Sequence, residues 1–163
     1  MTRTTSTNDA SGLHRRKVLF VCSSGGHLAQ LLELEHWWKD HDCHWVTFDL
    51  PDARSRLGDD FTAAHYPTTR NLPNALRNLK LALTVMKDFK PDVVISNGAA
   101  VAVPFFLEAK RRKIPTVFIE VYDRIDSRTM TGRLVKPIAT SFLVQWPEQQ
   151  QLYKGSTLIG TIY

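Results

Sequence analysis

The feature that most constrains the fold is the run from Lys17 to His27, KVLFVCSSGGH. An apolar strand leads here into a turn of small residues, and the turn ends at a histidine where an amphipathic helix begins. Glycine lets the backbone approach a ligand closely, and the first amides of a helix carry a partial positive charge. The run therefore predicts a strand, a helix from His27, and an anion-binding turn made of Ser24, Gly25 and Gly26, with phosphate as the best-fitting anion.

Other interpretations of this turn can be compared residue by residue. Gly25 and Gly26 could simply make a tight connection that His27 caps. A nucleotide-binding P-loop would need Gly-Lys-Ser/Thr, and a dinucleotide fingerprint would need three spaced glycines, so both are excluded. The strand also resembles the start of low-molecular-weight tyrosine phosphatases, but Leu28 stands where their phosphate-binding arginine would be. Cys22 is therefore expected to be a small apolar residue at a strand end.

Composition is that of one globular domain. The 163 residues are 43% hydrophobic and 23% charged, with a polar start that predicts a disordered tail over residues 1–15 and a folded domain over 16–163. The two cysteines, Cys22 and Cys43, show no metal-binding spacing, which favours a reducing cytoplasm and no zinc site. No apolar stretch reaches the roughly 18–20 residues of a spanning helix. The net charge of +5 favours an anionic partner but does not choose between nucleic acid, lipid and a phosphorylated substrate.

Strand and helix patterns alternate along the chain. Strands are expected at about 17–22, 44–48, 61–66, 92–96, 115–120 and 140–145, and helices at about 27–40, 72–89, 99–112 and 147–153. Such alternation predicts an α/β fold with a single doubly wound, mainly parallel sheet that is Rossmann-like. The apolar run at 116–119 fits a strand covered on both faces.

Polar clusters follow three of these strands. They are Ser23–His27, Asn97-Gly98 and Glu120–Arg124. Ligands of doubly wound sheets bind at the carboxyl ends of the strands, so the clusters are expected to meet at one edge. The polar stretch from Glu120 to Arg133 would suit a sugar and a phosphate, although its carboxylates and arginines could simply pair with one another on the surface.

Five segments together carry a family resemblance. They are SGGH at 24–27, KPDVVISNGAAVAVP at 90–104, Ile119-Glu120, SRTMTG at 127–132 and LIGTIY at 158–163. With these motifs the chain, from about residue 16 onward, resembles PssD-type exopolysaccharide biosynthesis proteins. Those proteins are bacterial relatives of the membrane-anchor subunit of the two-part N-acetylglucosaminyltransferase of the dolichol pathway. Gly-Gly-His on its own also recurs in MurG-like transferases.

The resemblance implies a GT-B glycosyltransferase divided over two chains, with this chain similar to the N-terminal, acceptor-binding half. A separate donor-binding subunit would bind the UDP-sugar, and the acceptor would be a lipid-diphosphate-linked sugar at the inner, cytoplasmic face of the cell membrane. The resemblance implies no catalytic metal, no cofactor and no nucleic-acid partner. The isolated chain is expected to be inactive.

By the same resemblance, the reaction is an inverting transfer in which a base removes the proton of the acceptor hydroxyl group. His27 is the first candidate for the base, or for a ligand of the diphosphate, and Glu120 is the second candidate base. The proposed acceptor and phosphate contacts are Ser24, Gly25, Gly26, Asn97, Gly98, Arg124, Thr131 and Gly132. Two other hypotheses stay open: a non-catalytic subunit that recruits its partner to the membrane, and a nucleotide-binding regulatory module.

The sequence lacks the membrane helix of the anchored relatives, and the segment 72–89 offers a substitute. One apolar stripe, expected to pack on the sheet, consists of Leu72, Leu76, Leu79, Leu83 and Met86. A second stripe of Leu81, Val85 and Phe89 lies beside Arg77, Lys80 and Lys87, and we expect it to contact an anionic membrane. Alternatively, the second stripe packs on a neighbouring helix or on the partner chain.

Overall fold

The computed structural model describes residues 14–162, and the predicted tail falls almost entirely outside this range. The chain forms a seven-stranded sheet in which all neighbouring strands are parallel, in the order β3-β2-β1-β4-β5-β6-β7. The predicted fold class, a doubly wound α/β domain, is confirmed. Strands are β1 Lys17–Val21, β2 Asp42–Phe48, β3 Thr62–Ala64, β4 Val93–Ser96, β5 Thr116–Ile119, β6 Ser141–Val144 and β7 Thr157–Leu158. Helices are α1 Gly26–Leu32, α2 Glu35–Trp38, α3 Pro51–Leu57, α4 Leu72–Phe89, α5 Ala102–Arg112, α6 Met130–Val135 and α7 Pro147–Leu152.

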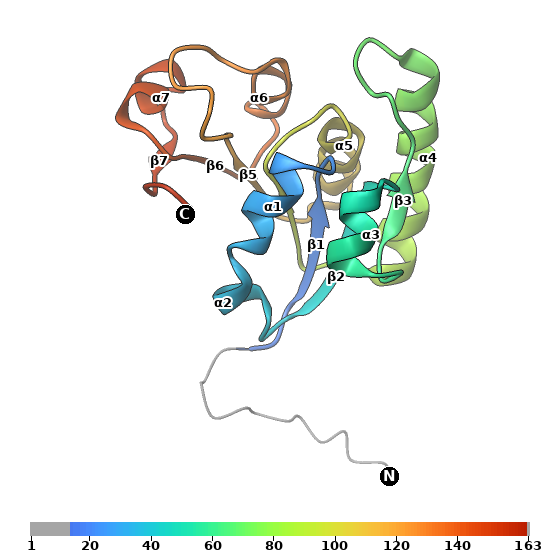
Figure 1. Ribbon diagram of the computed structural model, residues 1–163. Helices are drawn as coiled ribbons and strands as arrows, with labels where there is room; N and C mark the ends of the chain where they lie inside the picture. Colours follow the sequence, from blue (N-terminus) through green and yellow to red (C-terminus); the bar gives the residue numbers. More distant parts are fainter. Residues whose placement is uncertain (1–13, 163) are drawn as a thin grey trace.

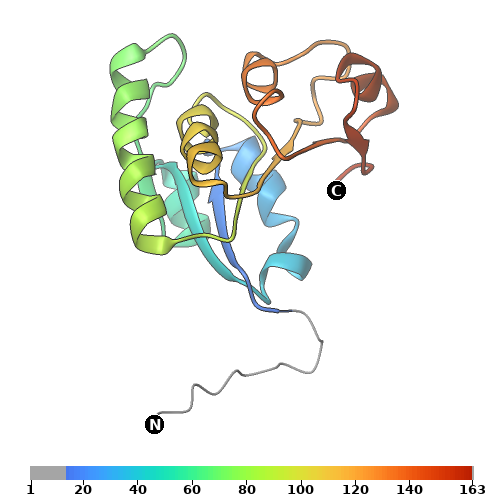
Figure 2. The same cartoon turned by 180° about the vertical axis from the view of Figure 1, so that it is seen from behind.

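Both faces of the sheet are covered, and β1 shows why its residues are continuously apolar. Val18 and Phe20 join the core cluster under α1 and α3, whereas Leu19 and Val21 join the cluster under α4, α5 and α6. All four side chains are fully buried, as alternation on a doubly covered strand requires. Figure 1 shows α1, α2 and α3 in front of the sheet, and Figure 2 shows α4 and α5 on the opposite face.

The prediction of one continuous helix over 27–40 is wrong, because this segment forms two short helices, α1 and α2. The chain turns between α1 and α2, where the Leu34 amide donates to the Leu31 carbonyl at 3.2 Å. The Trp38 indole nitrogen donates to the same carbonyl, also at 3.2 Å, and satisfies a backbone group at the end of α1. Periodicity alone missed this break, and it also missed the short elements α3, α6 and β7.

The two faces of α4 are not arranged as predicted. Val85 is buried, and Leu81 and Phe89 pack partly buried against the core cluster that also contains α5, so these three residues follow the alternative of packing on a neighbouring helix and do not form a membrane-contacting stripe. Of the stripe expected to pack on the sheet, Met86 is buried as predicted, whereas Leu72 and Leu76 are 71% and 56% exposed.

Two buried asparagines are the physical cause of this reversal. The Asn78 side chain accepts from the amide of His65 and donates to its carbonyl, both at 2.9 Å. Asn74 donates to the carbonyl of Pro67 at 2.9 Å. Because these polar side chains satisfy the backbone after β3, the face of α4 that carries them turns inward.

Candidate functional site

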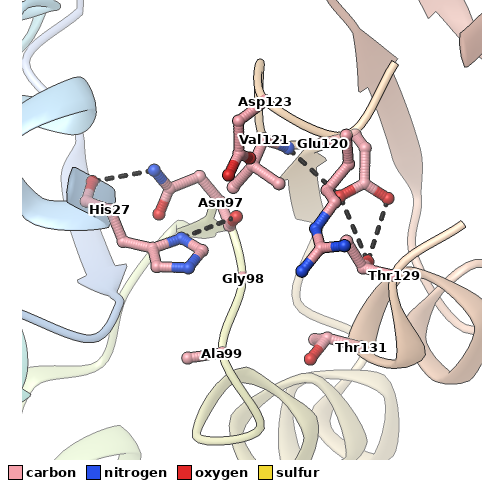
Figure 3. A pocket seen from close by; sticks show the side chains of 10 residues that line it. His27, Asn97, Gly98, Ala99, Glu120, Val121, Asp123, Thr129 and Thr131 are labelled. Carbon is pink, nitrogen blue, oxygen red and sulfur yellow. Dashed lines mark hydrogen bonds between the residues drawn. The ribbon is translucent and has the colours of Figure 1, made fainter. Parts of the chain in front are cut away.

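A cavity of about 240 Å³ lies at the carboxyl edge of the sheet, where the three predicted clusters converge (Figure 3). On one side are His27, Asn97, Gly98 and Ala99, which we call the His27 wall. On the other are Glu120, Val121, Asp123, Arg124, Thr129 and Thr131, which we call the Glu120 wall. The sheet thus brings together predicted site residues that are about 100 positions apart in sequence.

The His27 imidazole has a defined orientation. Its Nδ1 lies 3.1 Å from the carbonyl oxygen of Asn97, which can only accept, so Nδ1 carries the proton. In the neutral ring Nε2 then holds a lone pair, and no residue in the described part of the chain forms a hydrogen bond with it. Burial lowers the pKa of His27, while the Asn97 carbonyl, the charge of Asp123 and the Asn97 side chain oppose that shift. The ring is therefore neutral at pH 7 and equipped to accept a proton.

Asn97 and Gly98 hold this ring in place. The Asn97 side chain is fully buried and donates to the His27 carbonyl at 2.7 Å and to Gln30 Oε1 at 3.1 Å. Gly98 has φ +132°, and a β-carbon there would lie 2.7 Å from His27 Cε1. A side chain at position 98 would thus occupy the space of the imidazole.

Glu120 is fully buried in the opposite wall. Its carboxylate accepts hydrogen bonds from the Thr129 hydroxyl group, at 3.1 and 3.0 Å to its two oxygens, and from the Val121 amide at 3.1 Å. Burial raises the pKa of Glu120, and contacts with Tyr153, Val121 and Thr129 oppose the shift. The carboxylate thus fastens the end of β5 to the start of α6.

Gly132 supports this arrangement from behind and does not line the cavity. Its amide donates to Thr129 Oγ1 at 2.9 Å, which makes Thr129 the N-cap of α6. A β-carbon at position 132 would come within 2.4 Å of both Glu120 Oε2 and the Tyr153 hydroxyl oxygen. Glycine is required here because the carboxylate and the phenol fill the space.

The predicted phosphate turn is placed differently. The Gly25 amide donates to Asp52 Oδ2, so a carboxylate of α3 already occupies the amide that was expected to bind an anion. Ser24, Gly25 and Gly26 precede His27 without lining the cavity. The prediction that the Gly25 amide binds an anion is therefore wrong, because this amide already donates to Asp52. His27 itself lies at the carboxyl edge of the sheet, as predicted, and lines the cavity.

Cys22 is a core residue, in agreement with its sequence interpretation. The side chain is fully buried in the cluster under α1, and burial raises the pKa of its thiol to about 12. A thiol in this state is not a nucleophile at neutral pH. No cluster of three or more metal-ligating side chains occurs among residues 14–162.

Sequence reasoning did not single out several cavity residues. Asp123 falls in the predicted Glu120–Arg124 cluster without a role of its own, and Thr129 and Ala99 have no predicted role, yet all three line the cavity. The signal for Thr129 was present, because a threonine just before a helical turn is typical of an N-cap. Nothing local could have indicated the Gln30 contact with Asn97, which joins positions 67 residues apart.

Comparison with known proteins yields a family match. The model of the family described as "Oligosaccharide biosynthesis protein Alg14 like" matches residues 64–162. The human UDP-N-acetylglucosamine transferase subunit ALG14 is 28% identical over an alignment that covers 89% of this chain and 82% of that protein. A pyrophosphoryl-undecaprenol N-acetylglucosamine transferase from Caldanaerobacter subterraneus is 25% identical, covering 85% of this chain and 34% of that protein.

Solved structures share the fold. MurG from Acinetobacter baumannii superposes with a TM-score of 0.72 at 18% identity, covering 91% of this chain and 46% of the MurG chain. The UDP-N-acetylglucosamine 2-epimerase from Rickettsia bellii gives 0.70 at 16% identity, with the same coverage. The chain thus spans about half the length of these structures, and the fold alone does not separate a transferase from an epimerase.

Proposed function

This chain belongs to the Alg14-like family, and we propose that it is the acceptor-binding subunit of an inverting glycosyltransferase whose donor-binding half is a separate chain. The partner holds the UDP-sugar, and the acceptor is a sugar linked to a lipid through a diphosphate. Within the family we assign the chain to the PssD-type branch that assembles exopolysaccharide. Support for a subunit comes from the human relative, which is named as a subunit and is covered over 82% of its length.

The arrangement of His27 is the single observation that carries the catalytic part of the proposal. Its neutral ring offers an Nε2 lone pair beside the cavity, and its Nδ1–H is held by the Asn97 carbonyl. We assign His27 as the base that takes the proton of the acceptor hydroxyl group. The oxygen then attacks the anomeric carbon from the side opposite to the diphosphate, UDP leaves with the bonding electrons, and the configuration inverts.

Glu120 has a different role in this proposal. Its two oxygens already accept hydrogen bonds from Thr129 and Val121, and its side chain is fully buried. We therefore assign it as the residue that holds its wall together, in place of the second candidate base. Acceptor contacts are assigned to Asn97, Gly98, Arg124 and Thr131, which line the cavity. Asn97 Oδ1 is buried beside the His27 ring and has no partner with normal hydrogen-bond geometry within residues 14–162.

Calorimetric titration of the purified chain tests this assignment. We expect binding of farnesyl-diphosphate-linked glucose and no measurable binding of UDP-N-acetylglucosamine, because the donor site belongs to the partner. The variant His36→Ala, which changes an exposed histidine of α2 outside the cavity, should bind both compounds as the wild type does. Binding of the free nucleotide sugar without binding of the lipid-linked sugar would support a nucleotide-binding regulatory module instead.

We further propose that the α4–α5 face of the domain lies on the inner face of the cell membrane. Residues 72–113, which contain α4 and α5, hold eight basic and three acidic residues, a net charge of +5. Residues 26–60, on the opposite face, hold eight acidic and three basic residues, a net charge of −5. No helix within residues 14–162 has the length and apolar character needed to cross a bilayer. The charge difference favours one orientation on an anionic surface.

The exposed apolar residues of α4 lie on that basic face. Leu72, Leu76 and Leu83 are exposed, and Arg77, Lys80 and Lys87 are exposed on the same helix. In this proposal the exposed leucines contact the membrane in place of Leu81, Val85 and Phe89, which pack in or against the core. Shallow insertion of leucines with basic residues at the headgroups is the geometry of an interfacial helix.

Vesicle sedimentation tests this orientation. Each basic residue near an anionic surface contributes about 1 kcal/mol, so changing Arg77, Lys80 and Lys87 to glutamine should weaken binding to phosphatidylglycerol vesicles about a hundredfold. Added salt should weaken the wild type similarly. Lys39→Gln with Arg56→Gln, on the opposite face, is the matched control. Binding that is indifferent to lipid charge, to salt and to the α4 substitutions would leave membrane recruitment to the partner.

A further inference from the structure

The loop that forms most of the Glu120 wall has little regular structure of its own. Residues 120–129 connect β5 to α6, with one turn at Tyr122 and Asp123. Even so, the cavity requires this loop to present Glu120, Asp123 and Arg124 at fixed positions. Something outside the loop must therefore hold its backbone.

Gln149 of α7 supplies much of this support. Its side chain is fully buried, and its Nε2 donates to the carbonyl oxygens of Val121 at 2.6 Å and Arg124 at 3.2 Å. Its Oε1 accepts from the amides of Gln145 at 2.9 Å and Trp146 at 3.3 Å. Two carbonyls on one side and two amides on the other fix the orientation of the side-chain amide. A flipped amide would place its N–H groups against backbone N–H groups and its oxygen against carbonyl oxygens.

Two neighbouring side chains act in the same way. Gln145 is buried, and its Nε2 donates to the Glu120 carbonyl at 2.9 Å. The Trp146 indole nitrogen donates to the Tyr122 carbonyl at 2.7 Å. Four carbonyls within five residues of the loop, those of positions 120, 121, 122 and 124, thus accept hydrogen bonds from three side chains at the junction of β6 and α7.

We propose that Gln149, with Gln145 and Trp146, is a positioning residue for the acceptor site. These side chains do not line the cavity, and they act by fixing the backbone that presents Glu120, Asp123 and Arg124. This inference rests on the proposed function for its link to acceptor binding, but not for its claim about the loop. The amide side chain of Gln149 suits the task because it has two N–H donors for the two carbonyls and an oxygen that accepts from the two amides.

Hydrogen–deuterium exchange of the purified chain tests the claim about the loop. Gln149→Glu keeps the size and the acceptor oxygen but removes both donors, so exchange over residues 121–128 should accelerate at least about tenfold while β1 stays protected. Gln150→Glu is the matched control, because the neighbouring Gln150 is exposed and, within residues 14–162, its side chain donates to the Ser156 carbonyl alone. If Gln149→Glu does not fold, Trp146→Phe removes a single donor and should loosen the same segment by a smaller factor.

Titration with farnesyl-diphosphate-linked glucose tests the link to the acceptor. Gln149→Glu should weaken binding at least about tenfold, and Gln150→Glu should leave it unchanged. Wild-type exchange rates over 121–128 in both Gln149→Glu and Trp146→Phe would overturn the proposal, as would a loosened loop that binds the acceptor normally. A wild-type chain that does not bind this probe would count against the proposed function, and the exchange result would still decide whether the loop is held by Gln149.

Discussion

The two walls of the cavity are held in place by different kinds of interaction. The His27 wall follows directly from strands: β1 ends shortly before the Gly-Gly-His turn, and β4 ends at Ser96, directly before Asn97. The Asn97 carbonyl and the absence of a side chain at Gly98 orient the imidazole. The Glu120 wall is mostly an irregular loop, whose shape depends on Thr129, the N-cap of α6, and on the buried side chain of Gln149 in α7.

This difference corresponds to two roles in the proposed function: proton transfer at the His27 wall and acceptor recognition at the Glu120 wall. A group that transfers a proton needs a fixed lone pair, and regular secondary structure provides it at the end of a parallel sheet. A surface that recognises an acceptor can change through its loop and through the side chains that support that loop. We therefore expect substitutions that remove or displace the His27 ring to reduce turnover most, and substitutions in the Glu120 wall to reduce acceptor binding and stability most.

The largest expected effect separates the two walls by activity. His27→Ala should lower kcat of the assembled enzyme at least about a hundredfold, because a general base contributes about 10²–10⁴. Glu120→Gln should cost less than about tenfold, because an amide oxygen at the Oε1 position still accepts from Thr129 and Val121. Steady-state transfer assays measure both. A greater loss for Glu120→Gln than for His27→Ala would reverse the assignment of the base.

A second comparison uses two glycines and measures stability. Gly132→Ala should lower the free energy of unfolding by about 1–3 kcal/mol, because its β-carbon meets Glu120 and Tyr153 and overpacks the site. Gly26→Ala is the matched control, since no atom lies within 4 Å of its β-carbon and its φ is not positive. Denaturant unfolding of both variants gives the comparison. Equal stability of the two would contradict the tight contact behind the Glu120 wall.

Gly98→Ala examines the His27 wall in the same way. The positive φ and the clash with His27 Cε1 should together cost about 1–2 kcal/mol and turn the ring away from Asn97. Turnover should fall by a larger factor than acceptor affinity, because the Glu120 wall with its contacts Arg124 and Thr131 is unchanged. A parallel measurement of acceptor affinity and kcat distinguishes this outcome from a general loss of folding.

The smallest expected effect is a shift in pH dependence. Burial lowers the pKa of His27, so the base stays neutral until the pH falls below its usual value of 6.5. The acid limb of kcat/KM should therefore lie below pH 6.5, with activity lost as the pH falls through the His27 pKa. Gly98→Ala should move this limb upward, because the displaced ring is more hydrated. A limb that does not respond to Gly98→Ala would indicate that another group titrates.

The sequence predicts the parts of this molecule that local patterns encode. Apolar runs and alternating elements were sufficient for the parallel sheet, and small residues after β1 and β4 placed His27, Asn97 and Gly98 at one edge. Local patterns failed where hydrogen bonds between residues far apart in the sequence determine which side chains are buried. The buried faces of α4 were assigned wrongly because Asn74 and Asn78 bond the backbone after β3.

The same limit applies to the candidate site. The Gly25 amide is occupied by Asp52, which is 27 positions away in the sequence. The supporting role of Gln149 depends on a loop about 25 residues upstream. A polar residue on a short helix carries no local sign of such a contact, so only the tertiary structure reveals it.

The most direct test of the central claim is a transfer assay with radiolabelled UDP-N-acetylglucosamine and farnesyl-diphosphate-linked glucose. The purified chain is assayed alone, then with a membrane extract from the natural host lacking this gene, and the extract is also assayed alone; other UDP-sugars are tested in parallel. The account predicts no transfer from the chain or the extract separately, transfer from the mixture, and at least about a hundredfold less when His27→Ala replaces the wild type. Transfer by the single chain, or equal activity of His27→Ala in the mixture, would contradict it.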